Sequence, residues 1–173
     1  MKKTLVIALF ALSTMQVFAA TSAIDMVGVG VRYHAESSIY TDLPFGDGDM
    51  SYALSYEVHD TGDAYALQFA LDYAFDFSKE GMENMDYALT PQANLILKDK
   101  IWRGGVGVLK PYISNDDESD WADMYYQLFV GFGHKFGSIE TTLMTYYPFE
   151  SFSDLSDFEA GDLEYGIFAS IPI

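Results

Sequence analysis

Cysteine is absent from this chain, and basic residues are scarce. The lack of cysteine among 173 residues excludes disulfide scaffolds, thiolate metal sites and cysteine nucleophiles. Lysine and arginine number 9 against 26 aspartates and glutamates, for a formal net charge of −17. The chain therefore lacks the basic surface that nucleic-acid binding requires. Aromatic residues, by contrast, make up 16%, which separates the chain from the aromatic-poor disordered class.

Long hydrophobic runs are also missing. The apolar run at 5–12 is far shorter than the roughly 20 residues that a membrane-spanning helix needs. Two lysines precede it, and small residues follow it at Ala19 and Ala20, which is the pattern of a secretory signal peptide. We predict a signal peptide over 1–19, cleaved near Ala19 or Ala20. Any membrane-spanning part of the remaining chain must then consist of strands.

From residue 24 onward, apolar residues alternate with small or polar ones. This period of two is the signature of β-strands, and eight such segments follow one another. The clearest covers 65–77, where bulky residues at the odd positions oppose Ala, Gln and Asp at the even positions. Pro91 falls inside the fourth segment, where we expect a β-bulge because proline cannot donate a ladder hydrogen bond. The predicted connections alternate between long (37–48, 78–85, 114–121, 150–161) and short (60–63, 98–100, 135–138).

Eight strands joined by alternating long and short turns predict an all-β fold, an antiparallel up-and-down barrel over 24–173. Eight strands leave an interior only just wide enough for side chains. The face rich in glycine and alanine suits that interior, so we expect the bulky aromatic face to point outward. Large apolar side chains outside need an apolar solvent, which lipid provides. The reverse arrangement, a soluble periplasmic lipocalin-like binder, is the alternative.

This pattern resembles the small eight-stranded outer-membrane β-barrel proteins of Gram-negative bacteria. The resemblance covers the mature chain and is one of architecture; those proteins commonly end in phenylalanine, whereas this chain ends in Ile173. It implies a transmembrane β-barrel in the outer membrane, with long loops outside and both chain ends in the periplasm. Outer-membrane lipid, lipopolysaccharide and, during assembly, the barrel-assembly machinery are the implied partners. We expect a monomer without nucleic-acid partners.

Charged residues on the inward face predict a network inside the barrel. An unpaired buried charge is costly, so arginines and carboxylates on different strands should pair across the interior. Such a network is either a structural plug or the lining of a narrow polar channel. The predicted members are Arg32, Glu57, Asp72, Arg103, Glu140 and Glu164.

The long connections concentrate acidic residues. They predict a hydrated, self-repelling rim, or a surface that binds divalent cations loosely and through them lipopolysaccharide. Flexible clusters of oxygen ligands suit Ca²⁺, although the order of an EF-hand loop is missing. We expect no other cofactor or metal. The possible cation site comprises Asn115, Asp116, Asp117, Glu118 and Asp120.

The histidines give little sign of an active site. Ser55, Glu57 and His59 share one strand face, but residues two apart lie about 6.6 Å from each other, beyond the hydrogen-bond distance that a catalytic triad needs. His34 lies near the outer end of the first strand, and the sequence identifies no partner for it.

We therefore predict a non-catalytic outer-membrane barrel with acidic extracellular loops and a structural or surface-interaction role. The first alternative is a narrow, cation-preferring, porin-like channel, favoured by the negative rim and interior. A lipid-modifying enzyme that uses His34 is the second, and the soluble periplasmic binder is the third.

Overall fold

The computed structural model describes residues 24–35, 45–75, 77–79, 85–115 and 119–173. The predicted signal peptide lies outside these residues. No helix in the described part of the chain is long and apolar enough to cross a membrane. The elements are β1 (Ile24–Tyr33), β2 (Met50–His59), β3 (Tyr65–Ala74), β4 (Met85–Asp99), β5 (Trp102–Leu109), β6 (Tyr112–Asn115), β7 (Ser119–Trp121), β8 (Tyr125–Phe136), β9 (Ile139–Phe149), the 3₁₀ helices η1 (Phe152–Asp157) and η2 (Ala160–Asp162), and β10 (Glu164–Pro172).

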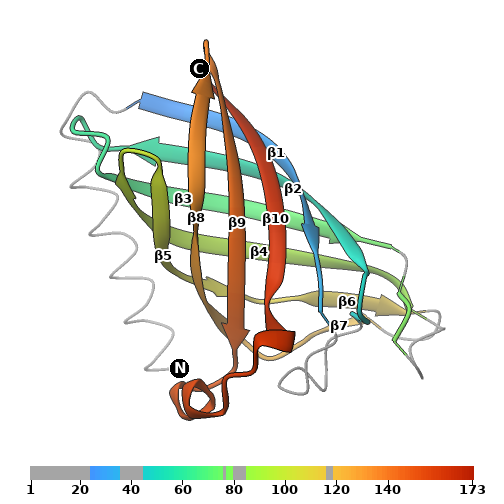
Figure 1. Cartoon of the computed structure of the whole chain (residues 1–173). Helices are drawn as coiled ribbons and strands as arrows, with labels where there is room; N and C mark the ends of the chain where they lie inside the picture. Colours follow the sequence, from blue (N-terminus) through green and yellow to red (C-terminus); the bar gives the residue numbers. More distant parts are fainter. Residues whose placement is uncertain (1–23, 36–44, 76, 80–84, 116–118) are drawn as a thin grey trace, which may run out of the picture.

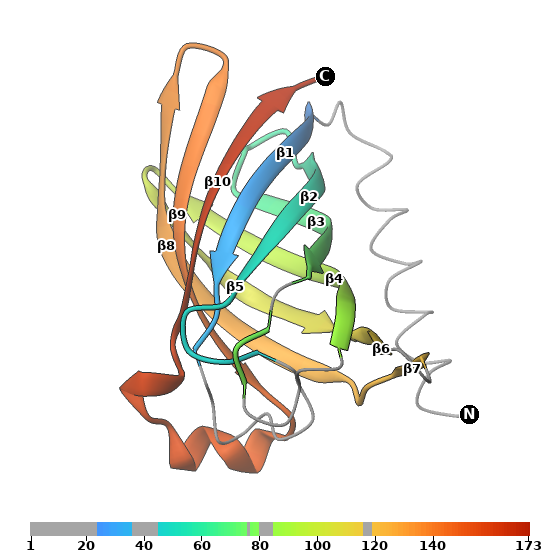
Figure 2. The same ribbon diagram turned by 90° about the vertical axis from the view of Figure 1, so that its right-hand side faces the viewer.

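Eight of these strands close into a barrel (Figures 1 and 2). The hydrogen-bonded order is β3-β2-β1-β10-β9-β8-β5-β4, and pairing of β3 with β4 completes the ring. Every pair is antiparallel. The predicted closed eight-stranded antiparallel barrel is confirmed. Strands β6 and β7 form a hairpin that follows β5 and leads into β8. It begins two residues before the predicted long connection 114–121 and occupies most of it.

The two ends of the barrel differ in their connections. Tight turns join β2 to β3, β4 to β5 and β8 to β9, and the pairing of Met26 with Pro172 puts the start of β1 and the end of β10 at this same end. We call it the short-turn end; it is uppermost in Figure 1. The opposite, long-loop end carries the β6–β7 hairpin and the 3₁₀ helices. This alternation matches the predicted one.

The bulge expected at Pro91 is not found there. The β3–β4 register runs through the Leu71–Pro91 pair without a shift. The interruption lies on the neighbouring strand instead, where β5 ends at Leu109 and β6 begins at Tyr112. The amide of Lys110 donates to the Pro91 carbonyl at 3.2 Å, and Pro91 has no N–H to return that bond. The hydrogen-bond ladder is therefore interrupted on the strand that faces Pro91, between β5 and β6, and not between β3 and β4.

Bulky apolar side chains point outward along every barrel strand. Val29 is 60% exposed, Leu54 55% and Ile167 54%, although such residues are normally buried in water-soluble domains. Most of the buried polar side chains belong to inward positions of the same strands. The barrel is thus inverted relative to a soluble domain, with its apolar surface outside.

The interior also contains an apolar layer, which corrects the expectation of a small and polar inner face. Ile96, Phe129, Met144 and Tyr146 are buried together with Ala66, and Phe168 packs against them. Inward glycines make room for these large rings: a Cβ at Gly105 would lie 2.7 Å from the Phe129 ring. Small and large inward residues therefore complement one another, as in other small barrels.

Candidate functional site

The half of the interior that lies towards the long loops is built around one buried arginine. Arg32 on β1 holds Glu164 on β10 with Nε and Nη2, at 2.6 and 2.5 Å from Oε2. Its Nη1 donates to Gln127 at 3.0 Å and lies 3.9 Å from Asp72. The guanidinium also stacks 4.2 Å from the centre of the Tyr146 ring. The Arg32 guanidinium thus connects β1 with β10, β8 and β3 through side-chain contacts. We call Arg32, His34, Ser51, Asp72 and Glu164 the long-loop cluster.

His34, just beyond β1, lies between a carboxylate and a hydroxyl. Its Nδ1 is 2.9 Å from Glu164 Oε1, and its Nε2 is 2.9 Å from Ser51 Oγ. A carboxylate only accepts hydrogen bonds, so all three groups are satisfied when Nδ1 donates to Glu164 and Nε2 accepts from Ser51. This is the connectivity of a serine–histidine–carboxylate triad.

Phe45 and the turn held by Asp49 cover the long-loop cluster on the side of the long loops. Phe45 stacks on the His34 ring, with ring centres 3.8 Å apart and planes 3° apart. Asp49 fastens the adjoining turn by accepting from the amides of Gly46 and Ser78. Ser51 is 1% exposed and His34 4%. The neighbouring cavity of about 10 Å³ is lined by His34 and Glu164 but not by Ser51, so the hydroxyl does not face open space.

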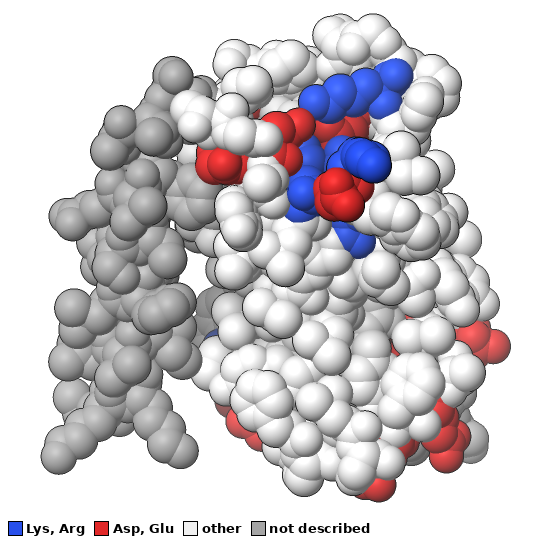
Figure 3. Space-filling view, turned by 60° about the vertical axis from the view of Figure 1, so that its left-hand side comes forward, with Lys and Arg blue, Asp and Glu red and all other residues white. Residues whose placement is uncertain are grey.

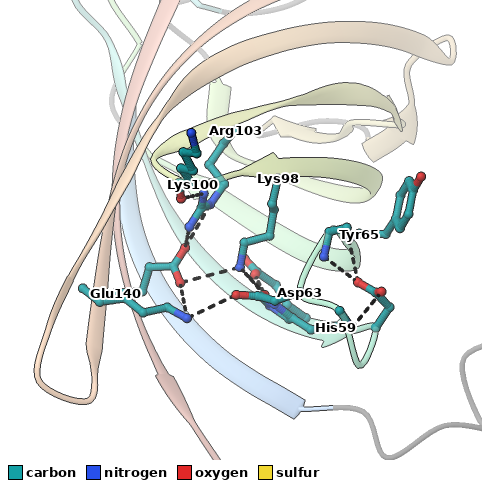
Figure 4. A network of polar contacts seen from close by, with 12 residues as sticks. His59, Asp63, Tyr65, Lys98, Lys100, Arg103 and Glu140 are labelled. Carbon is teal, nitrogen blue, oxygen red and sulfur yellow. Dashed lines mark hydrogen bonds and ion pairs between the residues drawn. The ribbon is translucent and has the colours of Figure 1, made fainter.

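A second cluster occupies the short-turn end (Figure 4). Arg103 on β5 holds Glu140 on β9 through Nε and Nη2, at 3.0 and 2.5 Å. Lys98 lies 2.8 Å from Asp63 and 3.6 Å from Glu140. Lys135 reaches the same two carboxylates at 3.2 and 3.7 Å. Each carboxylate therefore has at least two cationic neighbours. The short-turn cluster comprises these five residues with Glu57 and His59.

Asp63 joins this cluster from the β2–β3 turn. His59 lies between Asp63 and Glu57, with its ring nitrogens 2.8 and 2.9 Å from their oxygens. Partial burial raises the pKa of Asp63, but hydrogen bonds from Lys98 and His59 outweigh it and hold that pKa well below its usual value of 3.8. Asp63 is therefore a carboxylate across the physiological pH range.

The same turn is fixed by Asp60. Its carboxylate accepts from the amides of Gly62, Ala64 and Tyr65 at 3.0, 2.8 and 2.7 Å. These backbone hydrogen bonds, with that of Tyr65 the strongest, lower the pKa of Asp60. The turn thus presents Asp63 to the barrel mouth in one orientation, although Asp63 itself adopts a positive φ of 53°.

A chain of amide side chains connects the two clusters past the apolar layer. Gln68 donates to Glu57 at 2.7 Å, and Asn94 donates to Gln68 at 2.8 Å. Gln127, fully buried, donates to Asn94 at 2.7 Å and accepts from Arg32. A branch runs from Gln127 through Gln92 to Asp72.

Little free volume is left inside. Besides the 10 Å³ cavity, an interior pocket of about 30 Å³ lies between Glu57, Lys98 and the apolar layer. This is about the volume of one water molecule in the liquid. A larger, open pocket of about 340 Å³ lies at the short-turn end, between the two turns and the side chains of Lys98 and Arg103. Side chains therefore fill most of the described interior, and most of their buried polar atoms are hydrogen-bonded; Ser55 Oγ and Glu140 Oε2 are exceptions.

The six residues predicted for the interior network all lie in these clusters, but in two separate groups. Arg32, Asp72 and Glu164 belong to one, and Glu57, Arg103 and Glu140 to the other. The sequence analysis did not assign the cations Lys98 and Lys135 to the interior, nor the two histidines. Period-two spacing does put Lys98 on the inward face with Asn94, and this signal could have identified it.

The possible cation site is only partly described. Asp116, Asp117 and Glu118 lie outside the described residues. Asn115 ends β6, half-buried, and Asp120 in β7 is exposed and accepts from the amide of Trp121 at 2.7 Å. Within the described ranges, no three His, Asp or Glu side chains are grouped to hold a metal ion.

Charge is distributed unequally between the two ends. On the face shown in Figure 3, lysines and arginines gather among acidic residues at the short-turn end, whereas the opposite end shows acidic residues. A broad belt without charge separates them. The exposed acidic residues described at the long-loop end include Asp47, Asp86, Asp120, Asp123, Glu150, Asp157 and Glu159.

Comparison with known proteins identifies the fold. No family model and no curated protein matches the sequence. The crystal structure of Neisserial surface protein A matches with a TM-score of 0.54 and 8% identity, over 87% of this chain and 97% of that one. Ail, the attachment invasion locus protein of Yersinia pestis, in complex with the heparin analogue sucrose octasulfate, matches with a TM-score of 0.40 and 12% identity, over 87% and 96%. The match to Neisserial surface protein A shows a shared fold, the small eight-stranded barrel.

Proposed function

We propose that this protein is a non-catalytic outer-membrane barrel that acts through its long-loop surface. The observation that carries the proposal is the packed interior: among the described residues, most inward polar side chains pair with one another, and the two pockets that lie within the barrel measure about 30 and 10 Å³. A barrel without room inside offers partners its ends and its wall. The wall suits lipid, so the loops are the surface for contact.

The membrane location is supported by the outward surface. Aliphatic and aromatic residues cover the strands, and the charged residues of Figure 3 lie at the two ends. An apolar band between polar ends is the arrangement that a bilayer requires. The soluble periplasmic binder would need the opposite arrangement, with an apolar cavity inside.

For the long loops we propose contact with anionic lipopolysaccharide through bridging divalent cations. The exposed carboxylates at this end repel an anionic surface directly, whereas a hard cation with oxygen ligands can join the two. The contact would therefore depend on Ca²⁺ or Mg²⁺ and weaken with a chelator.

The channel alternative finds no support in the interior. A conducting path needs connected space at least one water molecule wide, whereas the two pockets within the described part of the barrel are small and share no lining residue. We expect no discrete conductance in planar bilayers at high protein density; cation-selective steps would reinstate the channel.

One observation favours a second candidate function, a serine hydrolase. Ser51, His34 and Glu164 have the connectivity and distances of an acyl-transfer triad. Two features oppose it: Ser51 faces no cavity, and Glu164 is shared with Arg32. A fluorophosphonate probe tests it. The folded wild type should remain unlabelled, whereas labelling that disappears in Ser51→Ala would establish the hydrolase.

Location and orientation are tested with single cysteines, which are unique labels in this chain. Gly161→Cys lies at the long-loop end, where an added side chain meets nothing within 4 Å. The matched control, Ser138→Cys, lies in the exposed β8–β9 turn. On intact cells a membrane-impermeant maleimide should label residue 161 and leave residue 138 unlabelled until the outer membrane is permeabilised. The reverse pattern, or labelling of neither in a soluble fraction, would overturn the proposal.

A further inference from the structure

In the segment between β9 and β10, apolar and polar side chains lie on different faces of a short 3₁₀ helix. A 3₁₀ helix has three residues per turn, so residues three apart lie on one face. Phe152, Leu155 and Phe158 therefore share a face of η1 and its C-terminal cap. The other two faces are polar, with Ser153, Ser156 and Glu159 on one and Asp154 and Asp157 on the other.

The apolar face of η1 lies against the outer wall of the barrel. The ring centre of Phe152 is 5.5 Å from those of Tyr126 and Phe149, and that of Phe158 is 4.9 Å from that of Tyr147. Tyr147 and Phe149 point outward like Leu143 on the same strand. Leu143 is 50% exposed, whereas Tyr147 is 6% and Phe149 2%. At this height, η1 covers the wall.

The apolar side chains of η1 that cover the wall are themselves exposed to the surroundings of the protein. Phe152 is 72% exposed, Phe158 52% and Leu155 37%. Their surface continues that of the neighbouring wall, where Val130 and Tyr165 are 54% and 47% exposed. The apolar wall therefore does not stop at the end of β9 but extends onto η1.

Local hydrogen bonds fix how η1 presents this face. Asp154 accepts from the amide of Ser151 at 2.8 Å and from its hydroxyl at 2.7 Å. Tyr147 Oη donates to the Asp154 carbonyl at 3.2 Å. Hydrogen bonds from Ser151, mainly through its side chain, lower the pKa of Asp154. The polar side of the helix therefore carries an ionised carboxylate.

We propose that residues 151–162 form a lipid anchor, in which the apolar face of η1 enters the acyl chains at the edge of the outer leaflet and the acidic faces stay among the headgroups. The inference rests on the membrane location proposed above. The occupant is bilayer lipid because the exposed aromatic face is continuous with the wall that faces lipid. Aromatic side chains at a membrane interface with charged residues towards water are typical of such anchors.

Nitroxide labels on single cysteines test the anchor. Leu155→Cys reports the apolar face, and Ser156→Cys, the adjacent residue on a polar face, is the matched control. Ile167→Cys on the β10 wall reports insertion of the barrel itself. The refolded proteins, checked for heat-modifiable gel mobility, are measured in phosphatidylcholine vesicles by collision with oxygen and with a water-soluble nickel chelate.

The label at 155 should resemble the one at 167, with a several-fold excess of oxygen over chelate collisions relative to 156. If 167 is protected but 155 and 156 are equally open to the chelate, the anchor is wrong and the barrel proposal stands. If 167 is open to the chelate, the membrane location fails, and the anchor fails with it.

Discussion

Each of the two charge clusters inside the barrel is centred on an arginine–glutamate pair, but the surroundings of the two pairs differ. In each, an arginine holds a glutamate through Nε and Nη2: Arg32 with Glu164, and Arg103 with Glu140. The short-turn cluster adds two lysines, so three cations face three carboxylates. In the long-loop cluster one guanidinium serves two carboxylates, with His34 as a further neighbour.

Access to water at the outer edge of the short-turn cluster explains the difference, since the side chains at its centre, Lys98, Arg103 and Glu140, are only 4–6% exposed. The side chain of Lys135 is 57% exposed and that of Asp63 39%, whereas those of Arg32, Asp72 and Glu164 are 4–6% exposed. Charges near water can be added at little cost, whereas each charge in the closed half must be paired. The open end can therefore be redundant, and the closed end depends on single residues.

The largest expected effect comes from removing the two arginines separately. Arg32→Met leaves Glu164 and Asp72 buried without their cation and should cost about 3–5 kcal/mol of unfolding free energy. Arg103→Met leaves Lys98 and Lys135 beside Glu140 and should cost about 2 kcal/mol. Urea titration in phospholipid vesicles measures both values. Equal losses would contradict the proposed difference in redundancy.

The connection between the clusters is tested at Gly107. A Cβ there would collide with the amide oxygen of Asn94 and come within 3.1 Å of Gln127. Gly107→Ala should therefore cost about 1–3 kcal/mol through overpacking. Gly104→Ala on the same strand is the control, because its Cβ would meet only the Phe129 carbonyl at 3.4 Å. A similar loss in both variants would mean that the cost arises from the strand and not from the amide chain.

Two serines on β2, Ser51 and Ser55, allow a comparison between a hydroxyl that makes a hydrogen bond and one that does not. Ser51→Ala removes the partner of His34 Nε2 and should cost about 1 kcal/mol. Ser55 is equally buried, and its Oγ has no hydrogen-bond partner among the described residues, so Ser55→Ala should be neutral or slightly stabilising. Thermal shifts of gel mobility compare the two. Destabilisation by Ser55→Ala alone would reverse their assigned roles.

The smallest effect concerns acid stability at the open end. Because the folded pKa of Asp63 lies below 3.8, its contribution is present above that pH and is lost as the pH falls through the folded value. Asp63→Asn should therefore flatten the acid dependence of stability between neutrality and low pH. Solvent screening limits the effect to less than about 1 kcal/mol. Asp99→Asn, at the same end and exposed, should leave the profile unchanged.

The strands and their facing were predictable because each depends on nearby residues. Alternation along 65–77 is a local signal, and the size of the inward residues is limited by barrel radius. For the same reason Arg32 and Glu164 could each be assigned inward from their own strand. Their mutual pairing could not, since it joins residues 132 positions apart and depends on the closing β1–β10 register.

Residues at strand ends were the least predictable. His34 lies just beyond the end of β1, where the alternation of the strand no longer fixes its direction, and its side chain points into the barrel. Phe129 and Met144 were also missed, because their fit depends on glycines of neighbouring strands. Helix η1 escaped detection since a six-residue 3₁₀ turn has too little length for a periodic signal.

The β6–β7 hairpin has a consequence for self-association. Closure leaves the eight barrel strands without free edges, but β7 pairs only with β6 in the described sheet. An unpaired edge is a template on which another chain can add a strand. Here the edge is three exposed residues long and carries Asp120 at its centre, and short length and charge both discourage such addition. At this position an acidic residue keeps neighbouring molecules apart, a role that requires no bound ion.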